Sequence, residues 1–429
     1  MAITWRVPVL VLLGIGPLLL RPSAGTAWAW VGLVVLLVIA DVLLAPPRST
    51  LSVVRDDVGR VRQGETTSTT LRLEAGGRRV RGILRDAWQP SAGATRNRHR
   101  LALPPGGQQV VTSRLRPVRR GDLRAARVTV RTLGPLGLAG RQGGTEVPGV
   151  LRVLPAFPSV RHLPSRLARL RELDGRASVR VRGQGTEFDS LREYVAGDDV
   201  RSVDWRASAR SQSVVVRTWQ PERDRRVFLV LDTGRTSAGR VDDVPRLDSA
   251  MDAALLLTAL ASRAGDQVAM VAGDLGVRSR LRVGHRRDAV EDMQQAMAGL
   301  QPVLAETNWR TLVGAVEKLG RQRALVVLLT PLEPSAVTSG LLPLVGSLTA
   351  RHRVLLASVR DPELGRLARE RGDARSTYAA AAAEQAAAQR DRTARLLATL
   401  GVEVLDADAD QLPVRLADHY LELKARGLL

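Results

Sequence analysis

The amino-acid sequence predicts a multi-domain membrane protein, in which a helical hairpin and a small antiparallel β-sandwich-like domain precede a doubly wound α/β domain. Three observations support this prediction. Two uncharged apolar stretches lie near the N-terminus, short alternating segments broken by glycine and proline follow, and apolar runs then alternate with amphipathic ones. At 429 residues, the chain is also longer than one ordinary domain.

The N-terminal region, residues 1–47, predicts a membrane hairpin. Its two uncharged stretches indicate transmembrane helices at about residues 3–20 and 27–45. As a helix, the second would span about 28 Å, which is close to the thickness of a hydrocarbon core. Trp28 and Trp30 suit the interfacial belt at the start of this helix.

A cleaved signal peptide is the competing interpretation, because residues 27–29 (Ala-Trp-Ala) resemble a cleavage site. Cleavage there would leave a new N-terminus inside the second apolar stretch, so a retained anchor is favoured. Only Arg21 lies between the two helices, whereas several arginines soon follow the second one, namely Arg48, Arg55, Arg60 and Arg62. The positive-inside rule then places both ends of the hairpin, and the body that follows, on the cytoplasmic side of the plasma membrane.

Residues 48–155 predict a small β-sandwich. Short runs alternate between apolar and polar side chains, for example at residues 69–73, 109–112 and 127–131. Glycine and proline pairs separate these runs, as is typical of antiparallel strands joined by turns. Most of the outward positions hold arginine.

The positive charge of the chain is concentrated before the α/β domain. Of the net charge of +21, +20 lies before residue 227, and nearly all of the basic side chains are arginine. A solvated surface enriched by arginine-rich codon usage is the first interpretation, and contact with anionic lipid headgroups is the second. Nucleic acid ranks last, because single-strand binders stack bases on aromatic side chains and residues 51–150 contain only Trp88.

Residues 227–429 predict a parallel sheet covered by helices on both faces. Strand-like apolar runs occur at 226–232, 324–330 and 354–359. Helical patterns occur at 247–258, at 289–297 after the candidate N-cap Asp288, at 378–400 and at 412–425. Ligands bind such sheets beyond the carboxyl ends of the strands, so Asp232 and the loop after it occupy the expected site position.

Residues 156–226 form a segment dense in charged and aromatic side chains. It contains Gly-x-Gly-x-Glu-Phe at 183–188, Leu-Arg-x-Tyr at 191–194, Gly-Asp-Asp-x-Arg at 197–201, Asp-Trp at 204–205 and Ser-Ala-Arg at 208–210. This linked series resembles the signature of the family called domain of unknown function 58, and the resemblance extends over the rest of the chain. It implies a two-helix membrane anchor, a β-domain and a domain similar to von Willebrand factor type A. It also implies an adaptor or co-chaperone role beside a MoxR-type AAA+ ATPase.

The signature residues have two main interpretations. As a brace, their ion pairs would join the sandwich to the α/β domain, with Phe188, Tyr194 and Trp205 packed beneath. As a docking surface, they supply the Trp, Tyr and Arg side chains that dominate interface energetics. A catalytic pair at Asp198 and Asp199 is a weaker hypothesis, because acid–base chemistry needs a cleft. The candidate partner-binding residues are Glu187, Phe188, Arg192, Tyr194, Asp198, Asp199, Arg201, Asp204, Trp205 and Arg210.

The resemblance to type A domains also implies a magnesium loop, Asp-x-Ser-x-Ser, with a Thr and a second Asp from later loops. In this chain the loop retains Asp232 and offers Thr236, but Gly234 replaces the middle Ser. Thr307 is a plausible later ligand, whereas Pro331 stands where the second Asp is expected. Two oxygen ligands are missing, so we predict no bound metal.

No other catalytic or cofactor site is predicted. The sequence has no cysteine, its histidines are scattered, and it lacks the GxxxxGK[ST] loop of an ATPase. We therefore expect a non-enzymatic adaptor that presents the surface around Asp232 and the signature segment to the ATPase. The alternatives are Mg²⁺-dependent ligand binding or hydrolysis at Asp232, and nucleic-acid or anionic-lipid binding by the arginine-rich β-domain.

Overall fold

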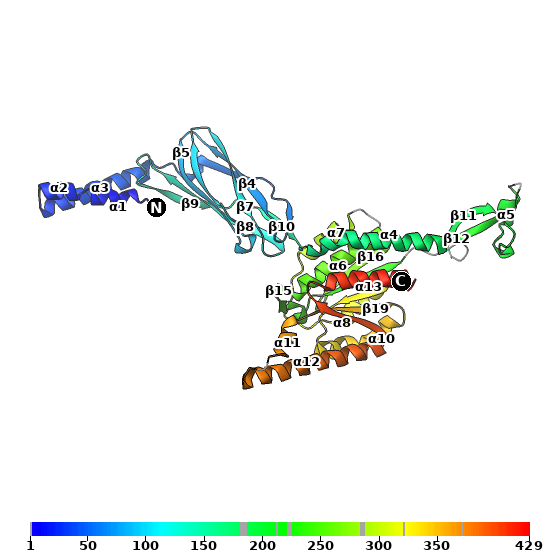
Figure 1. Cartoon of the computed structure of the whole chain (residues 1–429). Helices are drawn as coiled ribbons and strands as arrows, with labels where there is room; N and C mark the ends of the chain where they lie inside the picture. Colours follow the sequence, from blue (N-terminus) through cyan, green and yellow to red (C-terminus); the bar gives the residue numbers. More distant parts are fainter. Residues whose placement is uncertain are drawn as a thin grey trace. The chain divides into compact units, whose positions relative to one another are not determined.

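A computed structural model describes residues 2–180, 187–211, 213–220, 225–283, 288–320, 322–370 and 372–429. The chain divides into two compact units, Met1–Leu154 and Pro155–Leu429. Each unit is described by itself below (Figure 1).

The first unit begins with three apolar helices, α1 (Arg6–Leu12), α2 (Ile15–Leu20) and α3 (Ala24–Leu44). Only α3 is long and apolar enough, among the described helices, to cross a membrane. Its 21 residues extend about 31 Å, whereas the stretch from α1 to α2 would extend only about 22 Å even if it were continuous. Of the two predicted membrane-spanning helices, only the second, α3, has the length and composition to cross a membrane.

The shorter helices pack along α3 (Figure 1). The indole Nε1 of Trp30 donates a hydrogen bond to the carbonyl oxygen of Leu10 at 3.1 Å. A Cβ atom on Gly14 would lie 2.2 Å from the Trp30 ring, so glycine is needed where α1 gives way to α2. Trp30 thus holds the helices together, in addition to any interfacial role.

Two packed β-sheets form the rest of the first unit. One sheet joins β1 (Ala2–Ile3), β9 (Ala139–Thr145), β8 (Gly121–Leu133), β10 (Val150–Leu154) and β3 (Arg60–Arg62), with β5 (Val80–Trp88) and β6 (Arg98–Leu103) attached to β8. The other joins β2 (Leu51–Arg55), β4 (Thr67–Ala75) and β7 (Gln108–Leu115). Alternate apolar side chains of both sheets face one shared core. The prediction of antiparallel strands holds for most pairs, but β3 and β10 are parallel.

A buried ion pair lies inside this β-domain. Nη2 of Arg55 lies 2.7 Å from Oδ1 of Asp86, and both side chains are almost fully buried. The indole Nε1 of Trp88 donates to the same carboxylate at 3.1 Å, and the Arg55 guanidinium lies 4.9 Å from the Trp88 ring centroid. Arg55 is therefore not one of the outward arginines that the sequence pattern predicts.

The end of α3 is joined to the β-domain by Asp41, which is fully buried. Its carboxylate accepts hydrogen bonds from three backbone N–H groups in the β8–β9 turn, those of Leu136, Leu138 and Ala139, at 2.7 to 2.9 Å. Thr4, at the other end of the helical segment, donates its backbone N–H to the carbonyl oxygen of Leu138 at 2.9 Å. Both ends of the helical segment therefore meet the same turn.

The second unit contains a six-stranded sheet in the order β17-β16-β13-β18-β19-β20. The strands are β13 (Arg226–Asp232), β16 (Gln267–Gly273), β17 (Val277–Val283), β18 (Leu325–Leu329), β19 (Arg353–Arg360) and β20 (Val402–Asp408). The strand β17 is antiparallel to β16, and the other neighbouring pairs are parallel. Chain order reverses between β13 and β18, so their carboxyl ends mark the switch point where such sheets bind ligands.

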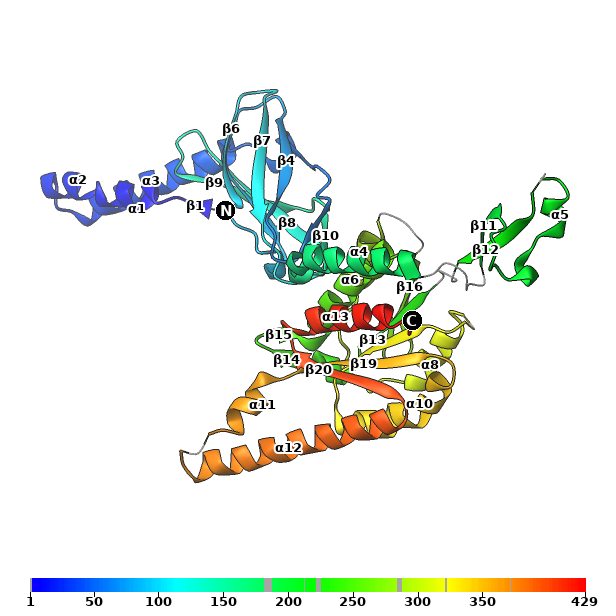
Figure 2. The same cartoon turned by 45° about the vertical axis from the view of Figure 1, so that its right-hand side comes forward.

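Helices cover both faces of this sheet, as the sequence predicts (Figure 2). One face carries α4 (Leu163–Arg180), α6 (Arg246–Arg263), α7 (Ala289–Ala298) and α13 (Leu412–Ala425). The other carries α8 (Trp309–Glu317), α10 (Leu342–Thr349) and α12 (Ala374–Thr399). Asp288 stands at the N-cap of α7, but its side chain makes no capping bond.

Short elements complete the second unit. They are η3 (Pro158–His162), η5 (Arg235–Ala238), β14 (Arg240–Val241), β15 (Val244–Pro245), α9 (Pro334–Ala336), η6 (Val337–Leu341) and α11 (Pro362–Leu367). The signature segment contributes β11 (Glu187–Glu193), η4 (Val200–Ser202), α5 (Trp205–Ser208) and β12 (Val215–Gln220). Among the described strands, β11 and β12 pair only with each other, so this hairpin is separate from the six-stranded sheet.

The Asp41 junction generates a stability prediction. Asp41→Ala removes the acceptor of three N–H groups, and each unsatisfied buried group costs about 1–3 kcal/mol. We expect a lower melting temperature in detergent and faster hydrogen–deuterium exchange at residues 136–139. Glu74→Ala, at an exposed carboxylate of β4, is the control and should change neither quantity. Unchanged exchange at residues 136–139 in Asp41→Ala would show that the junction does not depend on this carboxylate.

Candidate functional site

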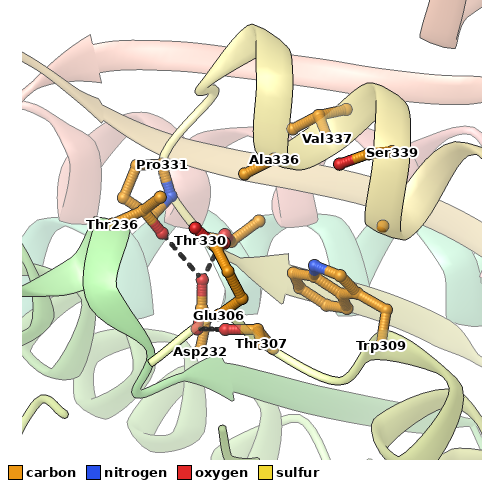
Figure 3. A pocket seen from close by; sticks show the side chains of 11 residues that line it. Asp232, Thr236, Glu306, Thr307, Trp309, Thr330, Pro331, Ala336, Val337 and Ser339 are labelled. Atoms are coloured by element: carbon orange, nitrogen blue, oxygen red, sulfur yellow. Dashed lines mark hydrogen bonds between the residues drawn. The ribbon is translucent and has the colours of Figure 1, made fainter. Parts of the chain in front are cut away.

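A small cavity of about 120 Å³ lies at the switch point of the second unit. Asp232, the last residue of β13, and Thr330, which follows β18, both line it and are joined by a hydrogen bond (Figure 3). The remaining lining residues are Thr236, Glu306, Thr307, Trp309, Pro331, Ala336, Val337, Ser339 and Gly340. The sequence placed Asp232 at this edge correctly, but it did not identify Thr330 as part of the site.

The carboxylate of Asp232 is 1% exposed and accepts four hydrogen bonds. The backbone N–H of Gly234 donates to Oδ1 at 2.7 Å, and the Thr307 hydroxyl donates to the same oxygen. The hydroxyls of Thr330 and Thr236 donate to Oδ2 at 2.7 Å and 3.2 Å. One buried carboxylate thus connects the loop after β13, the segment before α8 and the end of β18.

Among the described residues, no basic side chain pairs with Asp232. Arg235 pairs instead with Glu306, with 2.6 Å between Nη2 and Oε1, and Arg240 lies near Asp243. Asp232 caps its own loop instead, by accepting the Gly234 N–H bond. Arg235 and Arg240 do not pair with Asp232, because both lie against acids on exposed loops.

Gly234 stands where a type A loop has its middle serine, and the structure gives a reason for the glycine. A Cβ atom at this position would lie 2.1 Å from Oγ1 of Thr307 and 3.0 Å from Oδ1 of Asp232. The Thr307 hydroxyl therefore reaches the carboxylate through the space that a serine side chain would need. The glycine at position 234 and the hydrogen bond from Thr307 to Asp232 therefore depend on one another.

The oxygen-rich lining raises the question of a divalent cation. Mg²⁺ prefers carboxylate, hydroxyl and water oxygens, and three hydroxyls surround Asp232. However, Asp232 is the only carboxylate in the bonded group, and each of its oxygens already accepts two hydrogen bonds. No group of three or more His, Cys, Asp or Glu side chains suited to a metal occurs in the described part of the chain. The oxygens around Asp232 are thus of the type that Mg²⁺ prefers, but a single carboxylate does not balance the charge of a divalent cation.

The signature hairpin forms the second candidate site, and its acids serve the hairpin itself. Asp198 accepts from Arg192 at 2.5 Å and from the backbone N–H of Val195 at 3.0 Å, and these bonds lower the pKa of its carboxyl. Asp199 accepts from the backbone N–H of Arg201 at 2.9 Å. The two carboxylates thus accept hydrogen bonds from different donors of the hairpin.

Asp204 connects the two halves of the hairpin. Its Oδ1 caps α5 by accepting from the backbone N–H groups of Ala207 and Arg206, and its Oδ2 lies 2.7 Å from Nη2 of Arg217 on β12. The Ala207 bond and then the Arg217 bond lower the pKa of this carboxyl. The signature acids therefore brace the hairpin internally. The contacts of Asp198 and Asp204 are within the hairpin and do not join the β-sandwich to the α/β domain.

The aromatic side chains that the structure describes in the signature, and its remaining arginines, are exposed. Trp205 is 68% exposed and Tyr194 is 38% exposed, so the expectation that these rings pack beneath the ion pairs is wrong. Arg201 and Arg210 are exposed as well. Gly183 and Gly185 lie outside the described residues, and so do the side chains of Glu187 and Phe188.

The Gly234–Thr307 contact generates a second prediction. Gly234→Ala would force Thr307 away from Asp232, and we expect the free energy of unfolding of the second unit to fall by about 1–3 kcal/mol. The double variant Gly234→Ala/Thr307→Ala should lose less than the sum of its single variants, because the clash is removed. Gly346→Ala, where a Cβ atom meets nothing within 4 Å, is the control. Denaturant unfolding followed by circular dichroism gives the free energy of unfolding of the two single variants, the double variant and the control. If the losses of the two single variants simply add up in the double variant, the explanation is refuted.

Comparisons with known proteins cover parts of the chain. Uncharacterised proteins of Mycobacterium tuberculosis and Mycobacterium bovis are 28% identical over 190 residues, which is 42% of this chain and 57% of theirs. The chain thus spans little more than half the length of these relatives. Among solved structures, a PapD-like domain of human CEP192 matches 26% of this chain and 89% of its own, at 16% identity and a TM-score of 0.19. A CARDB domain from Pyrococcus furiosus matches 27% of this chain and 92% of its own, at 14% identity and the same TM-score. Scores this low support no conclusion about the fold.

The family comparison covers the signature hairpin from β11 onward, the Asp232 cavity and most of the six-stranded sheet. Residues 190–395 match the model described as protein of unknown function DUF58. The matched segment contains four of the five signature motifs and both candidate sites. Over these residues, slightly less than half of its length, the chain matches the DUF58 family of proteins of unknown function.

Proposed function

We propose that this protein is a membrane-anchored, non-enzymatic adaptor or co-chaperone that presents its second unit to a MoxR-type AAA+ ATPase on the cytoplasmic side of the plasma membrane. The partner is proposed from the family resemblance of the signature. The proposal includes no catalytic step and no resident cofactor. The process that the complex serves is left open.

The anchor in this proposal is a hairpin formed by α1 and α2 with α3. Both ends of the helical segment bond to the β8–β9 turn, through Thr4 and Asp41, which supports a hairpin whose two ends lie on one side of the membrane. Pairing of β1 with β9 further supports a retained N-terminal segment over a cleaved one, because the strand belongs to the sheet. The arginines that follow α3 favour the cytoplasmic side.

The second unit is proposed to be a von Willebrand factor type A-like domain. Its strand order and single antiparallel edge strand support this assignment, since the order of the central strands creates one switch-point surface at Asp232. The proposed adaptor presents this surface together with the hairpin. Arg235 and Glu306 form an exposed ion pair at the rim of the cavity, where a partner surface can reach them.

The observation that carries the proposal is the signature hairpin. It contains most of the family signature, it belongs to no larger sheet, and it exposes Trp205 rather than burying it. A segment that served only as core packing would bury its large aromatic side chain. Exposed Trp and Arg side chains are instead typical of residues that dominate protein–protein interfaces.

Co-purification in mild detergent tests the adaptor role. We expect the full-length chain to retain a co-expressed MoxR-type ATPase, and a variant with residues 187–220 replaced by a Gly-Ser linker to lose it. The replacement removes no strand from the six-stranded sheet, so that sheet should still form. The Asp41→Ala variant, altered in the other unit, is the control and should retain the ATPase. If the wild-type chain retains no ATPase, the adaptor proposal is wrong.

A second candidate function is Mg²⁺-dependent ligand binding at the degenerate loop. The Thr330 hydroxyl favours this second function. Thr330 precedes Pro331, which stands where the second Asp is expected, and its hydroxyl supplies an additional oxygen in the cavity. Asp232, Thr236, Thr307 and Thr330 would hold the ion, and a bound Mg²⁺ would attract an acidic group from a ligand.

Calorimetric titration separates the two functions. For the metal-free adaptor, we expect a flat trace when Mg²⁺ or Mn²⁺ is added to the purified chain, because a lone carboxylate does not balance a divalent charge. The variant Thr330→Val keeps the shape of the side chain and removes its oxygen, and its trace should be equally flat. Saturable heat in the wild type that Thr330→Val weakens would contradict the metal-free proposal and establish the second candidate.

A further inference from the structure

We infer that the tip of the signature hairpin binds an acidic protein surface that contains a pocket for an indole ring. The tip patch comprises Val200, Arg201, Trp205, Arg206 and Arg210. This inference rests on the proposed adaptor function and specifies the chemistry by which the hairpin recognises its partner.

The tip patch lies in the connection between β11 and β12. Glu193 pairs with Val215 at the last position of the two-stranded ladder, so residues 194–214 form the end of the hairpin, including η4 and α5. Figure 2 shows α5 at this end. Within the hairpin, Val215 and Val216 are buried, whereas none of the described residues of the tip is buried and most of them are exposed.

The tip is held in a defined conformation by its own acids. Asp204 caps α5 and bonds Arg217, and Asp198 bonds Arg192 and the N–H of Val195. The pKa values of both carboxyls lie below their ordinary range, so both acids are charged at neutral pH. A braced loop loses less conformational entropy on binding than a flexible one. The tip patch is therefore organised before a partner arrives.

The same bonds leave the tip with unpaired positive charge. Asp198 and Asp204 are each matched by an arginine of the hairpin strands. In contrast, the exposed Arg201, Arg206 and Arg210 have no acidic partner within the described residues. Arg206 and Arg210 are four residues apart around a helical turn, in which the Arg210 N–H donates to Ala207, so they lie on the same side. Three guanidinium groups on one tip complement carboxylates of a partner.

Trp205 supplies the apolar part of the patch. Its side chain is 68% exposed and that of Val200 is 61% exposed, although an indole is among the most favourable groups to bury at an interface. A pocket that accepts the ring would remove this apolar surface from water. The arginines around it would pair with carboxylates at the pocket rim.

An acidic protein fits the tip better than an anionic membrane does. Glu193 and Asp199 are exposed on the same end of the hairpin, and a uniformly negative lipid surface would repel both carboxylates. A protein surface accommodates mixed charges, because its own acids and bases occupy separate positions. The apolar surface of the tip patch, limited to one indole and one valine, also suits a discrete pocket.

The test measures binding of a purified MoxR-type ATPase to the full-length chain in nanodiscs, by biolayer interferometry. We expect Trp205→Ala and the double variant Arg206→Glu/Arg210→Glu each to weaken binding at least tenfold, and wild-type binding to weaken as salt rises. The matched controls are Tyr378→Ala, an aromatic side chain that is 80% exposed on α12, and Arg98→Glu/Arg100→Glu on β6. The control variants should bind within twofold of the wild type.

The outcomes distinguish this inference from the adaptor function itself. If the ATPase binds the wild type and both tip variants equally, the tip patch is not the contact and only this inference fails. If the tip variants weaken binding in discs that contain phosphatidylglycerol but not in discs of phosphatidylcholine alone, the patch acts on lipid and the inference is wrong. If the wild type does not bind, both proposals fail.

Discussion

The carboxylate of Asp232 organises the switch point of the six-stranded sheet. It ends β13, is almost fully buried, and receives hydrogen bonds from three threonine hydroxyls and one backbone N–H. A buried charge without a basic partner is costly unless donors surround it. The loop after β13, the segment before α8 and the end of β18 are therefore held where they satisfy this one group. Gly234 is part of the same constraint, because any side chain there would displace Thr307.

Carboxylates that accept backbone N–H groups perform a similar task elsewhere in the chain. Asp41 binds the β8–β9 turn to the end of α3, and Asp204 caps α5 while it holds Arg217. In each case one short acidic side chain connects separate segments through hydrogen bonds. At the tip of the hairpin, in contrast, the exposed Arg201, Arg206 and Arg210 have no acidic partner among the residues that the structure describes. This division between paired acids and unpaired arginines is what gives the proposed docking surface its charge.

The separation of the signature into bracing and exposed residues bears on how adaptors of this kind would work. The acids hold the hairpin in one conformation, so substitutions there should disturb the whole tip, whereas substitutions of Trp205 or Arg206 should act only on binding. The hairpin belongs to no larger sheet, so it can vary its tip without changing the core of the α/β domain. Within this one segment, the acids thus maintain the conformation of the hairpin, while the exposed tryptophan and arginines are available to bind a partner.

Much of the architecture follows from local pattern in the sequence. The helix α12 is predictable because its alanine-rich sequence has a high helix propensity. The runs that become β13, β18 and β19 are legible because a strand buried on both faces must be apolar throughout. Asp232 was identified for the same reason, since the acid directly follows such a run. The sequence did not reveal that Thr330 and Thr307 converge on Asp232, or that Arg55 is buried against Asp86. Those contacts join residues 31 to 98 positions apart, and only the packing of the sheets and loops brings them within hydrogen-bonding distance. Local periodicity determined the elements of this protein, while tertiary packing decided which polar side chains meet, because hydrogen bonds depend on distances in space that no spacing in the sequence specifies.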